Sequence, residues 1–308
     1  MLDKDIQSIT VEYADETFVY LNNQNNKEQV NIIEGYEGDY AEAQYSLKNG
    51  LLFQEDKEHK EDKEDKEDKE DEKLNLISTL HKSLLPSLDN LIDNFNDVEA
   101  YLQPYEDPGG DFLWYKNYDN GKCLVILGDC TGHGVQGAMI AMSVITLLKQ
   151  SFYKCPNDLL ETVYAFYDKM ADLLEDDNRG GFDSQMGFLL FDFNNKFVEY
   201  TGNGINMIHK SNDKKITVHH TRYIQLFKRK LGIHKIKLKD RDQLLIYTDG
   251  ITDQYDSDNR RKLGRKNLRD MVYNLTQENT LNDFVSKFND FRGNVKQMDD
   301  QSMLIITI

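Results

Sequence analysis

The chain is poor in cysteine and has no long apolar run. Its 308 residues contain three cysteines, Cys123, Cys130 and Cys155, and no C-x-x-C pair. An odd number without that spacing argues against a disulfide framework and against a cysteine-based zinc site, so we expect a reducing compartment. No run approaches the roughly 18 apolar residues of a membrane span, and residues 1–10 lack the features of a secretory signal. We therefore expect a cytoplasmic protein with no membrane partner.

Positive charge is also scarce. The chain has 37 basic and 54 acidic side chains, a formal net charge of -17. Such a chain repels the phosphate backbone, so we expect no nucleic-acid partner. An acidic protein can still act on an anionic substrate when bound metal ions reverse the local field.

Part of the negative charge lies in one tract, residues 55–73, which holds twelve acids and six lysines in an E-D-K repeat and no apolar residue. It cannot bury a face and must be solvated, either as an exposed helix or as a disordered linker. We interpret it as a linker after a small N-terminal region of unknown role, residues 1–54. That region has strand-like runs at 17–21 and 29–33 and no chemical motif.

The remaining chain reads as a helical lead-in, residues 74–97, and a larger domain, residues 98–308. Apolar spacing predicts a helix within 74–92 that Pro86 ends or kinks. The predicted strands are 98–116 (broken by Pro104 and Pro108), 122–129, 184–204 (a hairpin turning at 194–195), 242–250 and 302–308. The predicted helices are 139–152, 158–177, 266–276 and 280–292. Because strands and helices do not alternate strictly, we expect an α+β fold with antiparallel sheets covered by helices.

Aspartates stand at the ends of four predicted strands. They are Asp111, Asp129, Asp249 and the pair Asp299-Asp300, and three of the four places have a glycine beside the acid. Each one alone is explained by a turn. Together they indicate a site, because converging carboxylates are tolerated when divalent cations neutralise them. A donor set made only of oxygen suits Mg²⁺ or Mn²⁺.

Five segments carry a resemblance to a known family. They are SLLPSL (83–88), PGGDF (108–112), LGDCTGHGVQGAMIAM (127–142), LLIYTDGITD (244–253) and MDDQSMLIITI (298–308). In this order, over residues 74–308, they resemble the SpoIIE-type branch of the protein phosphatase 2C superfamily. The resemblance implies an antiparallel β-sandwich flanked by helices on both faces, in α-β-β-α layers, and two divalent cations, Mn or Mg.

The resemblance also implies an activity and its residues. Members are metal-dependent serine/threonine protein phosphatases in which a hydroxide bridging the two metals attacks phosphorus. Their usual substrates are phosphoserine or phosphothreonine on small STAS-type regulatory proteins (anti-sigma factor antagonists). By this resemblance Asp129 bridges both metals, the carbonyl of Cys130 completes one shell, Asp249 and Asp299 hold the first metal, with Asp300 as the alternative to Asp299, and Asp111 reaches the second.

The segment after Asp129 is rich in glycine. We interpret Gly132, Gly134 and Gly137 as clearance for metal and phosphate, with positive φ where the turn needs it. A helix starting at Val135 would direct its N-terminal dipole to the site. His133 either protonates the leaving oxygen or holds the loop, and the sequence leaves both roles open.

Three further expectations complete the interpretation. A nucleotide cyclase is the weaker reading of GGDF, because the second acid of its motif is missing and the later aspartates stay unexplained. A regulatory module that keeps the fold with little turnover is the alternative to an active phosphatase. Residues 74–92 are expected to gate activity or to mediate a homodimer.

Overall fold

A computed structural model describes the backbone of residues 8–12, 18–22, 29–36, 39–48, 51–54, 64–173, 184–221, 231–275 and 280–308. It describes side chains from Leu74 onward within these ranges, except those of Asn90 and Leu173. The chain forms two compact units, Met1–Asp68 and Lys69–Ile308. The domain boundaries expected from sequence remain predictions.

The first unit is a five-stranded antiparallel sheet whose strands follow one another in chain order. Its strands are β1 (Ser8–Glu12), β2 (Phe18–Asn22), β3 (Gln29–Tyr36), β4 (Asp39–Lys48) and β5 (Leu51–Gln54). The two runs expected to be strands correspond to β2 and β3. Of the charged tract, residues 64–73 belong to helix α1 (Glu64–Leu84), and residues 55–63 lie outside the described residues.

The second unit contains two five-stranded antiparallel sheets. The first has the order β13-β10-β9-β8-β7 and the second β12-β11-β14-β15-β6. The strands are β6 (Asp97–Gln103), β7 (Asp111–Tyr118), β8 (Lys122–Cys130), β9 (Ser184–Asp192), β10 (Phe197–Asn203), β11 (Asn206–Lys210), β12 (Ile216–His219), β13 (Ile233–Lys237), β14 (Gln243–Tyr247) and β15 (Gln301–Thr307). The hairpin predicted within 184–204 is confirmed by the pairing of β9 with β10.

Strand β8 shows why the central strands have continuous apolar sequences. Cys123, Val125 and Leu127 point between the two sheets, where they join buried side chains of β14 and β15. Leu124 and Ile126 alternate with them and point outward to a helical layer. Because both faces are covered, the strand reads as a continuous apolar run and not as an alternating one.

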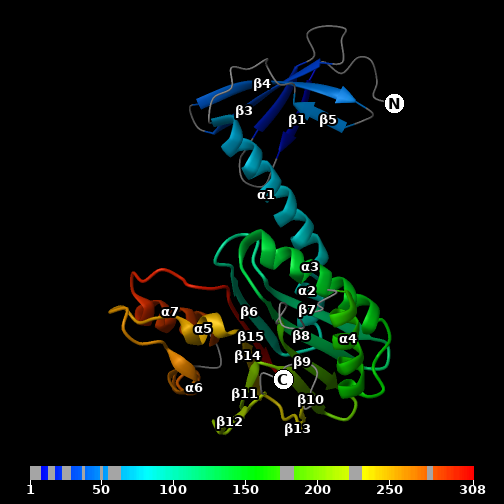
Figure 1. Ribbon diagram of the computed structural model, residues 1–308, viewed down its shortest axis with the longest axis vertical. Helices are drawn as coiled ribbons and strands as arrows, with labels where there is room; N and C mark the ends of the chain where they lie inside the picture. The colour runs from blue at the N-terminus through cyan, green and yellow to red at the C-terminus, as the bar shows by residue number, and fades with distance from the viewer. Residues whose placement is uncertain are drawn as a thin grey trace. The chain divides into compact units, whose positions relative to one another are not determined.

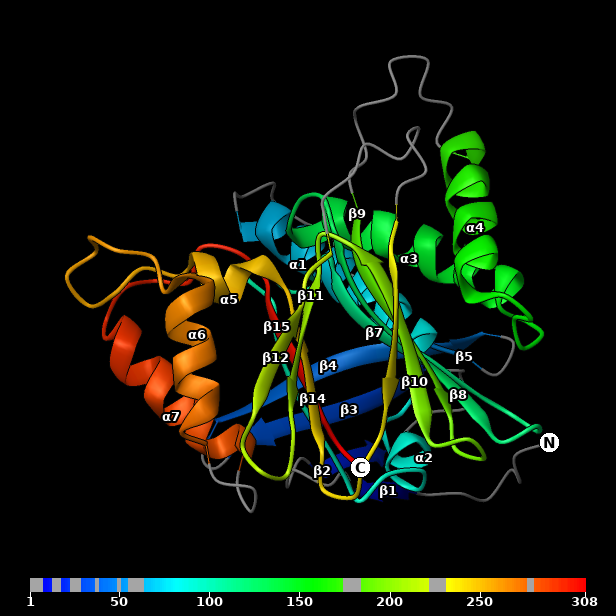
Figure 2. The same cartoon turned by 90° about the horizontal axis from the view of Figure 1, so that it is seen from below.

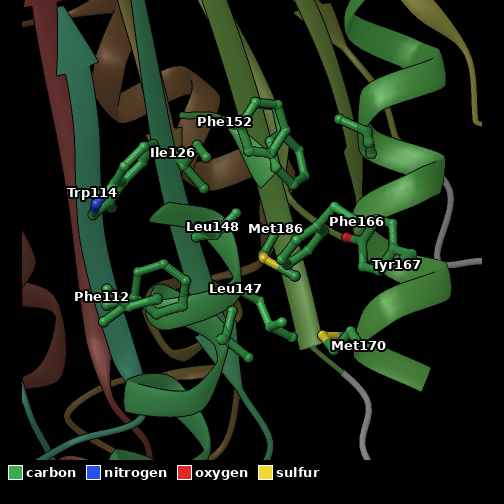
Figure 3. Close-up of a cluster of buried hydrophobic side chains, with 14 of the residues drawn as sticks. Phe112, Trp114, Ile126, Leu147, Leu148, Phe152, Phe166, Tyr167, Met170 and Met186 are labelled. Atoms are coloured by element: carbon green, nitrogen blue, oxygen red, sulfur yellow. The ribbon is translucent and has the colours of Figure 1, made fainter. Parts of the chain in front are cut away.

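Helices α3 (Gly134–Ser151) and α4 (Leu159–Leu173) form the layer on the first sheet. Figure 3 shows Phe166, Tyr167 and Met170 of α4 pointing from the helix toward the side chains on the sheet. These side chains belong to one buried cluster with Phe112 and Trp114 of β7. Burial of this apolar surface holds the helices on the sheet. Residues 174–177, expected to extend α4, lie outside the described residues.

Helices α5 (Asp249–Asp253), α6 (Gly264–Tyr273) and α7 (Thr280–Arg292) cover the second sheet. Their buried side chains, such as Leu268 and Phe284, pack on Leu245 and Ile305 of the sheet. Figures 1 and 2 show these helices and the pair α3–α4 on opposite sides of the strands. The expected α-β-β-α sandwich is confirmed. The strand expected over 242–250 ends earlier, at Tyr247, because Asp249 begins a helix.

The helix of the lead-in segment ends just before Pro86, as expected. Helix α1 stops at Leu84, two residues before Pro86, and the short helix α2 (Asp89–Ile92) follows. Ser78 and His81 of α1 are buried, whereas Leu76 and Leu80 are 61% and 50% exposed. A homodimer through residues 74–92 stays a prediction. Within the described ranges, no helix is long and apolar enough to cross a membrane.

Candidate active site

One end of the first sheet carries a row of polar side chains. Asp111 begins β7, and antiparallel register places it directly opposite Asp129 of β8. Gln185 of β9 lies opposite Asp129 on its other side. Directly opposed residues of neighbouring strands share a face. The sheet therefore aligns Asp111, Asp129 and Gln185, with Asp129 in the middle.

The second sheet brings its acids together in the same way. Strands β14 and β15 are neighbours, and the Thr248 N–H donates to the Ser302 carbonyl at 3.0 Å just beyond their paired residues. This places Asp249 beside the Asp299-Asp300 pair. The backbone contact is so close that a Cβ on Gly250 would lie 2.0 Å from the Asp300 carbonyl oxygen. Only glycine fits there.

Two hydrogen bonds join the groups of the two sheets. Thr248 Oγ1 donates to Asp111 Oδ2 at 2.8 Å, and Gln185 Nε2 donates to Asp249 Oδ2 at 2.7 Å. Gly204, with φ of 82°, leaves room for Gln185, because a Cβ there would lie 2.3 Å from Oε1 of that side chain. The acids expected from sequence at four separate strand ends thus lie at one end of the sandwich.

The neighbouring acids Asp299 and Asp300 have different surroundings. Asp300 is buried, and its carboxylate accepts the backbone N–H groups of Tyr105 (2.7 Å), Gly110 (2.5 Å) and Asp111 (3.2 Å). Asp299 is exposed, and its Oδ1 accepts the N–H of Asp300 at 2.9 Å. Asp300 therefore anchors the loop before β7, which leaves Asp299 as the better candidate ligand of the pair.

The carboxylates act on one another electrostatically. Burial, together with the charges of Asp300 and Asp299, raises the pKa of Asp111 to about 8. Burial and then the charges of Asp111 and Asp249 raise the pKa of Asp129 well above its usual range. Asp299 is exposed as a residue, but partial desolvation of its carboxylate and the charges of Asp249 and Asp300 raise its pKa, against the opposing effects of the Asp300 N–H and His133. Because these carboxylates repel one another when ionised, a bound cation would stabilise their charged forms.

The carboxylates of the site lie near one another, but their oxygens do not converge on a single position. Within the described residues, no three His, Cys, Asp or Glu groups are gathered tightly enough to hold an ion. Asp111 is turned to Thr248 and Asp249 to Gln185, which accounts for this spacing. All the side-chain donors are carboxylate oxygens, a chemistry that fits Mg²⁺ or Mn²⁺. Ligation requires the carboxylates to come closer together than they lie in this structure.

The glycines after Asp129 serve more than one purpose. Gly132 and Gly134 have φ of 92° and 62°, as expected for a turn that needs left-handed backbone. At Gly137 the expected clearance for metal and phosphate is not what the contacts indicate. A Cβ there would lie 2.3 Å from the Gly132 carbonyl oxygen and 3.0 Å from Gly110 Cα, so this glycine lets α3 pack on the loop. The helix begins at Gly134, one residue earlier than expected.

His133 precedes the first residue of α3 in extended backbone, with φ of -119° and ψ of 175°. Its Nδ1 lies 3.0 Å from Oε2 of Glu106, and its ring meets the Tyr105 ring edge-on at 4.9 Å between centroids. Among the described residues none is hydrogen-bonded to its Nε2. The side chain is therefore held in the loop through one ring nitrogen, while the other is available for chemistry.

Cys130 lies beside Asp129 and packs inward. Its thiol accepts a hydrogen bond from Ser184 Oγ at 3.7 Å, and burial raises the pKa of this thiol. The carbonyl faces Gly110, where a Cβ would lie 2.7 Å from the Cys130 oxygen. The backbone thus approaches the site closely at this point, and ligation by this carbonyl stays a prediction.

Comparison with known proteins identifies the family. The family model of stage II sporulation protein E (SpoIIE) matches residues 119–308, more than half of the chain. The chain belongs to the SpoIIE family. The resemblance seen in the five sequence segments is thereby confirmed, and the second unit has the fold of a protein phosphatase 2C domain. The family match includes Asp129, Asp249 and Asp299 and begins after Asp111.

Solved structures share the fold at low sequence identity. The SiaA-PP2C domain of Pseudomonas aeruginosa has a TM-score of 0.69 and 18% identity, covering 79% of this chain and 98% of that one. The SpoIIE phosphatase domain with a regulatory-domain fragment from Bacillus subtilis has a TM-score of 0.57 and 13% identity, covering 68% and 62%. RsbX in complex with magnesium has a TM-score of 0.50 and 14% identity, covering 68% and 92%. No curated protein matches the chain significantly in sequence.

Three residues of this SpoIIE-family site were not expected from sequence. Glu106, Gln185 and Thr248 each contact a residue that was expected, namely His133, Asp249 and Asp111. Thr248 stands next to Asp249 in the TDG segment, which is the only local signal among the three. Gln185 and Glu106 are brought in by strand register and loop path, over 64 and 27 residues of chain.

Proposed function

We propose that this chain is a metal-dependent serine/threonine protein phosphatase. The observation that carries the proposal is the meeting of Asp111, Asp129, Asp249 and Asp299 at one end of the sandwich, where burial and mutual repulsion raise the pKa of three of them. Acids gathered at one place, with pKa values raised by desolvation and by one another, mark a candidate functional site.

Two divalent cations, Mn or Mg, fit this donor set. Asp129 lies between Asp111 and Gln185 at the end of the first sheet, and would hold both ions. Asp249 and Asp299 are assigned to one ion, and Asp111 with the Cys130 carbonyl to the other. Asp300 is not assigned, because its oxygens already accept three backbone N–H groups.

When bound, the cations supply the positive charge that lowers the pKa of the attacking water and offsets charge on the phosphoryl oxygens. The chain's own residues position the substrate and move a proton. The loop from Cys130 to Gly134 contains two glycines, so a phosphate can approach its backbone there and the N-terminus of α3. His133 is placed to give a proton to the leaving serine or threonine oxygen.

The substrate class is a phosphoserine or phosphothreonine on a small regulatory protein of the STAS type. Membership in the SpoIIE family supports this assignment, since it is the usual substrate class of the branch that the motifs resemble. The competing function is a binding module with the same fold and little turnover. The four retained acids favour turnover.

Hydrolysis of p-nitrophenyl phosphate with Mn²⁺ or Mg²⁺ tests the proposal. We expect metal-dependent hydrolysis by the native chain and a loss of at least about a hundredfold in Asp129→Asn, which removes one charge at the centre of the site. Asp172→Asn, the same change on the exposed side of α4, is the matched control and should retain full activity. Phosphoserine, phosphothreonine and phosphotyrosine peptides then define the class.

The result can contradict the proposal. If the native chain, shown to be folded, hydrolyses no faster than Asp129→Asn with either metal, the phosphatase assignment is wrong and the binding module stands. Faster release of phosphate from phosphotyrosine than from phosphoserine and phosphothreonine would leave the phosphatase but overturn the substrate class.

A further inference from the structure

Glu106 is the residue that touches His133 and has no role in the site so far. Its Oε2 lies 3.0 Å from His133 Nδ1, and the same oxygen would be 2.7 Å from a Cβ on Gly134. We infer that Glu106 is a positioning residue that fixes the His133 ring so that Nε2 delivers the proton to the leaving oxygen. This inference rests on the proposed phosphatase function and adds to it a residue from another segment of the chain.

The contact determines which ring nitrogen is available. A carboxylate only accepts hydrogen bonds, so His133 Nδ1 must carry a proton to bond to Glu106. Tyr105 meets the ring edge-on, which limits its rotation about the side-chain bonds. With Nδ1 occupied and the ring held from a second direction, Nε2 is the atom left to exchange a proton. Orientation of an imidazole by a hydrogen-bonded carboxylate is the arrangement that makes it an efficient proton donor.

The loop that carries Glu106 is fixed to the carboxylate cluster. The Tyr105 and Gly110 N–H groups, on either side of Glu106, both donate to the carboxylate of Asp300. Asp300 in turn follows Asp299, and nearby His133 acts to lower the pKa of Asp299. Asp300, which is adjacent to the candidate ligand Asp299, therefore fixes the loop that carries Glu106. Glu106 in turn holds His133.

Stability does not explain the pair. Both side chains are about half exposed, 49% for His133 and 57% for Glu106. Exposed ion pairs contribute little to folding because water and salt screen them. An exposed carboxylate that orients one imidazole beside the candidate metal ligands is better explained by a role in proton transfer.

The proton balance of the step is complete. His133 enters the step with a proton on each ring nitrogen. Water attacks phosphorus, the bond between phosphorus and the serine or threonine oxygen breaks, and that oxygen takes the proton from His133 Nε2, which leaves the neutral Nδ1–H ring. The attacking water loses one proton, which returns His133 to its starting form. The products are the free hydroxyl and inorganic phosphate, and Glu106 accepts the Nδ1 hydrogen bond throughout.

Activity measured on substrates with leaving groups of different basicity distinguishes a positioning role of Glu106 from a general loss of active-site structure. A nitrophenolate leaves without a proton, whereas a serine alkoxide needs one. We expect Glu106→Ala to lower kcat about tenfold on a phosphoserine peptide and less than twofold on p-nitrophenyl phosphate, with KM little changed. Glu106→Gln keeps an acceptor oxygen and should recover most of the loss. Glu161→Ala, an exposed glutamate on α4, is the control.

Equal losses on the two substrates, or no loss on the peptide, would overturn the inference. Absence of all hydrolysis by the native chain would instead overturn the proposed function. A readout independent of turnover is the ¹⁵N spectrum of the His133 ring, assigned by its loss in His133→Asn. The charged donor form of the ring carries protons on both nitrogens, so the comparison is made on the neutral ring. There the native chain should hold the Nδ1–H tautomer, and Glu106→Ala should revert to the Nε2–H tautomer. An unchanged ring spectrum in Glu106→Ala also refutes the positioning role.

Discussion

The pair Asp299-Asp300 allows one chemical change to be made at two adjacent positions with opposite expected results. Asp300→Ala removes the acceptor of the Tyr105, Gly110 and Asp111 N–H groups. Hydrogen bonds to a charged group contribute about 1.5 to 3 kcal/mol each, and the contributions are not additive. Water can reach part of the loop, because Tyr105 is exposed. We expect the free energy of unfolding to fall by about 3 kcal/mol.

Asp299→Ala should behave differently. Asp299 is exposed as a residue, but partial desolvation of its carboxylate and the charges of the neighbouring acids raise its pKa, so the folded state gains little from its charge. We expect a change within about 0.5 kcal/mol in metal-free buffer, together with a clear loss of Mn²⁺ affinity. For a domain of this size, the Asp300→Ala effect corresponds to a melting temperature about 6 to 12 °C lower.

The assay follows from the sequence. Trp114 is the single tryptophan and is buried in β7, so its fluorescence in a urea titration reports unfolding of the phosphatase domain without a contribution from residues 1–54. Comparable destabilisation by both changes, or a larger effect of Asp299→Ala, would refute the assignment of Asp300 as anchor and Asp299 as candidate ligand.

Two further predictions concern the same site. Gly137→Ala should destabilise the domain by about 2 kcal/mol, because the new Cβ would meet the Gly132 carbonyl and this outweighs a helix-propensity gain of about 1 kcal/mol. Urea unfolding midpoints measure the effect, with the exposed change Gln136→Ala as the control. A stabilised Gly137→Ala variant would contradict the prediction. In metal-free buffer the raised pKa of Asp111, about 8, means that the folded chain keeps a proton that the unfolded chain releases near pH 4, so stability should fall as pH rises from 4 to 8. Asp111→Asn should flatten that slope in urea midpoints taken across this range, and an unchanged slope would exclude Asp111 as its source.

The layers of the fold could be predicted because their signals are local. Strand β8 is a continuous apolar run, the run of α3 is apolar around most of its surface, and the hairpin at 194–195 has turn residues between two strands. Such patterns depend on neighbours within a few residues. They place the elements and give the fold class, while the exact ends, as at Tyr247, depend on packing that the pattern does not contain.

The candidate acids could be proposed for a related reason. Each stands where an apolar strand ends, and sheets packed face to face bring strand ends together at the rim. What the sequence could not supply is which residues meet across the rim. Thr248 reaches Asp111, and Gln185 reaches Asp249, only because the register of β9 against β8 and the packing of one sheet on the other place them there.

The unequal roles of Asp299 and Asp300 follow from strand geometry. Both acids immediately precede β15, and successive side chains of an extended backbone point to opposite sides. One acid can therefore be buried under the loop before β7 while the other stays exposed near Asp249 and His133. A sequence of two aspartates does not reveal which is which, because that depends on where the loop carrying Tyr105 and Gly110 crosses the strand end. The same crossing brings Glu106 to His133, so one loop connects the anchor acid to the residue proposed to move the proton.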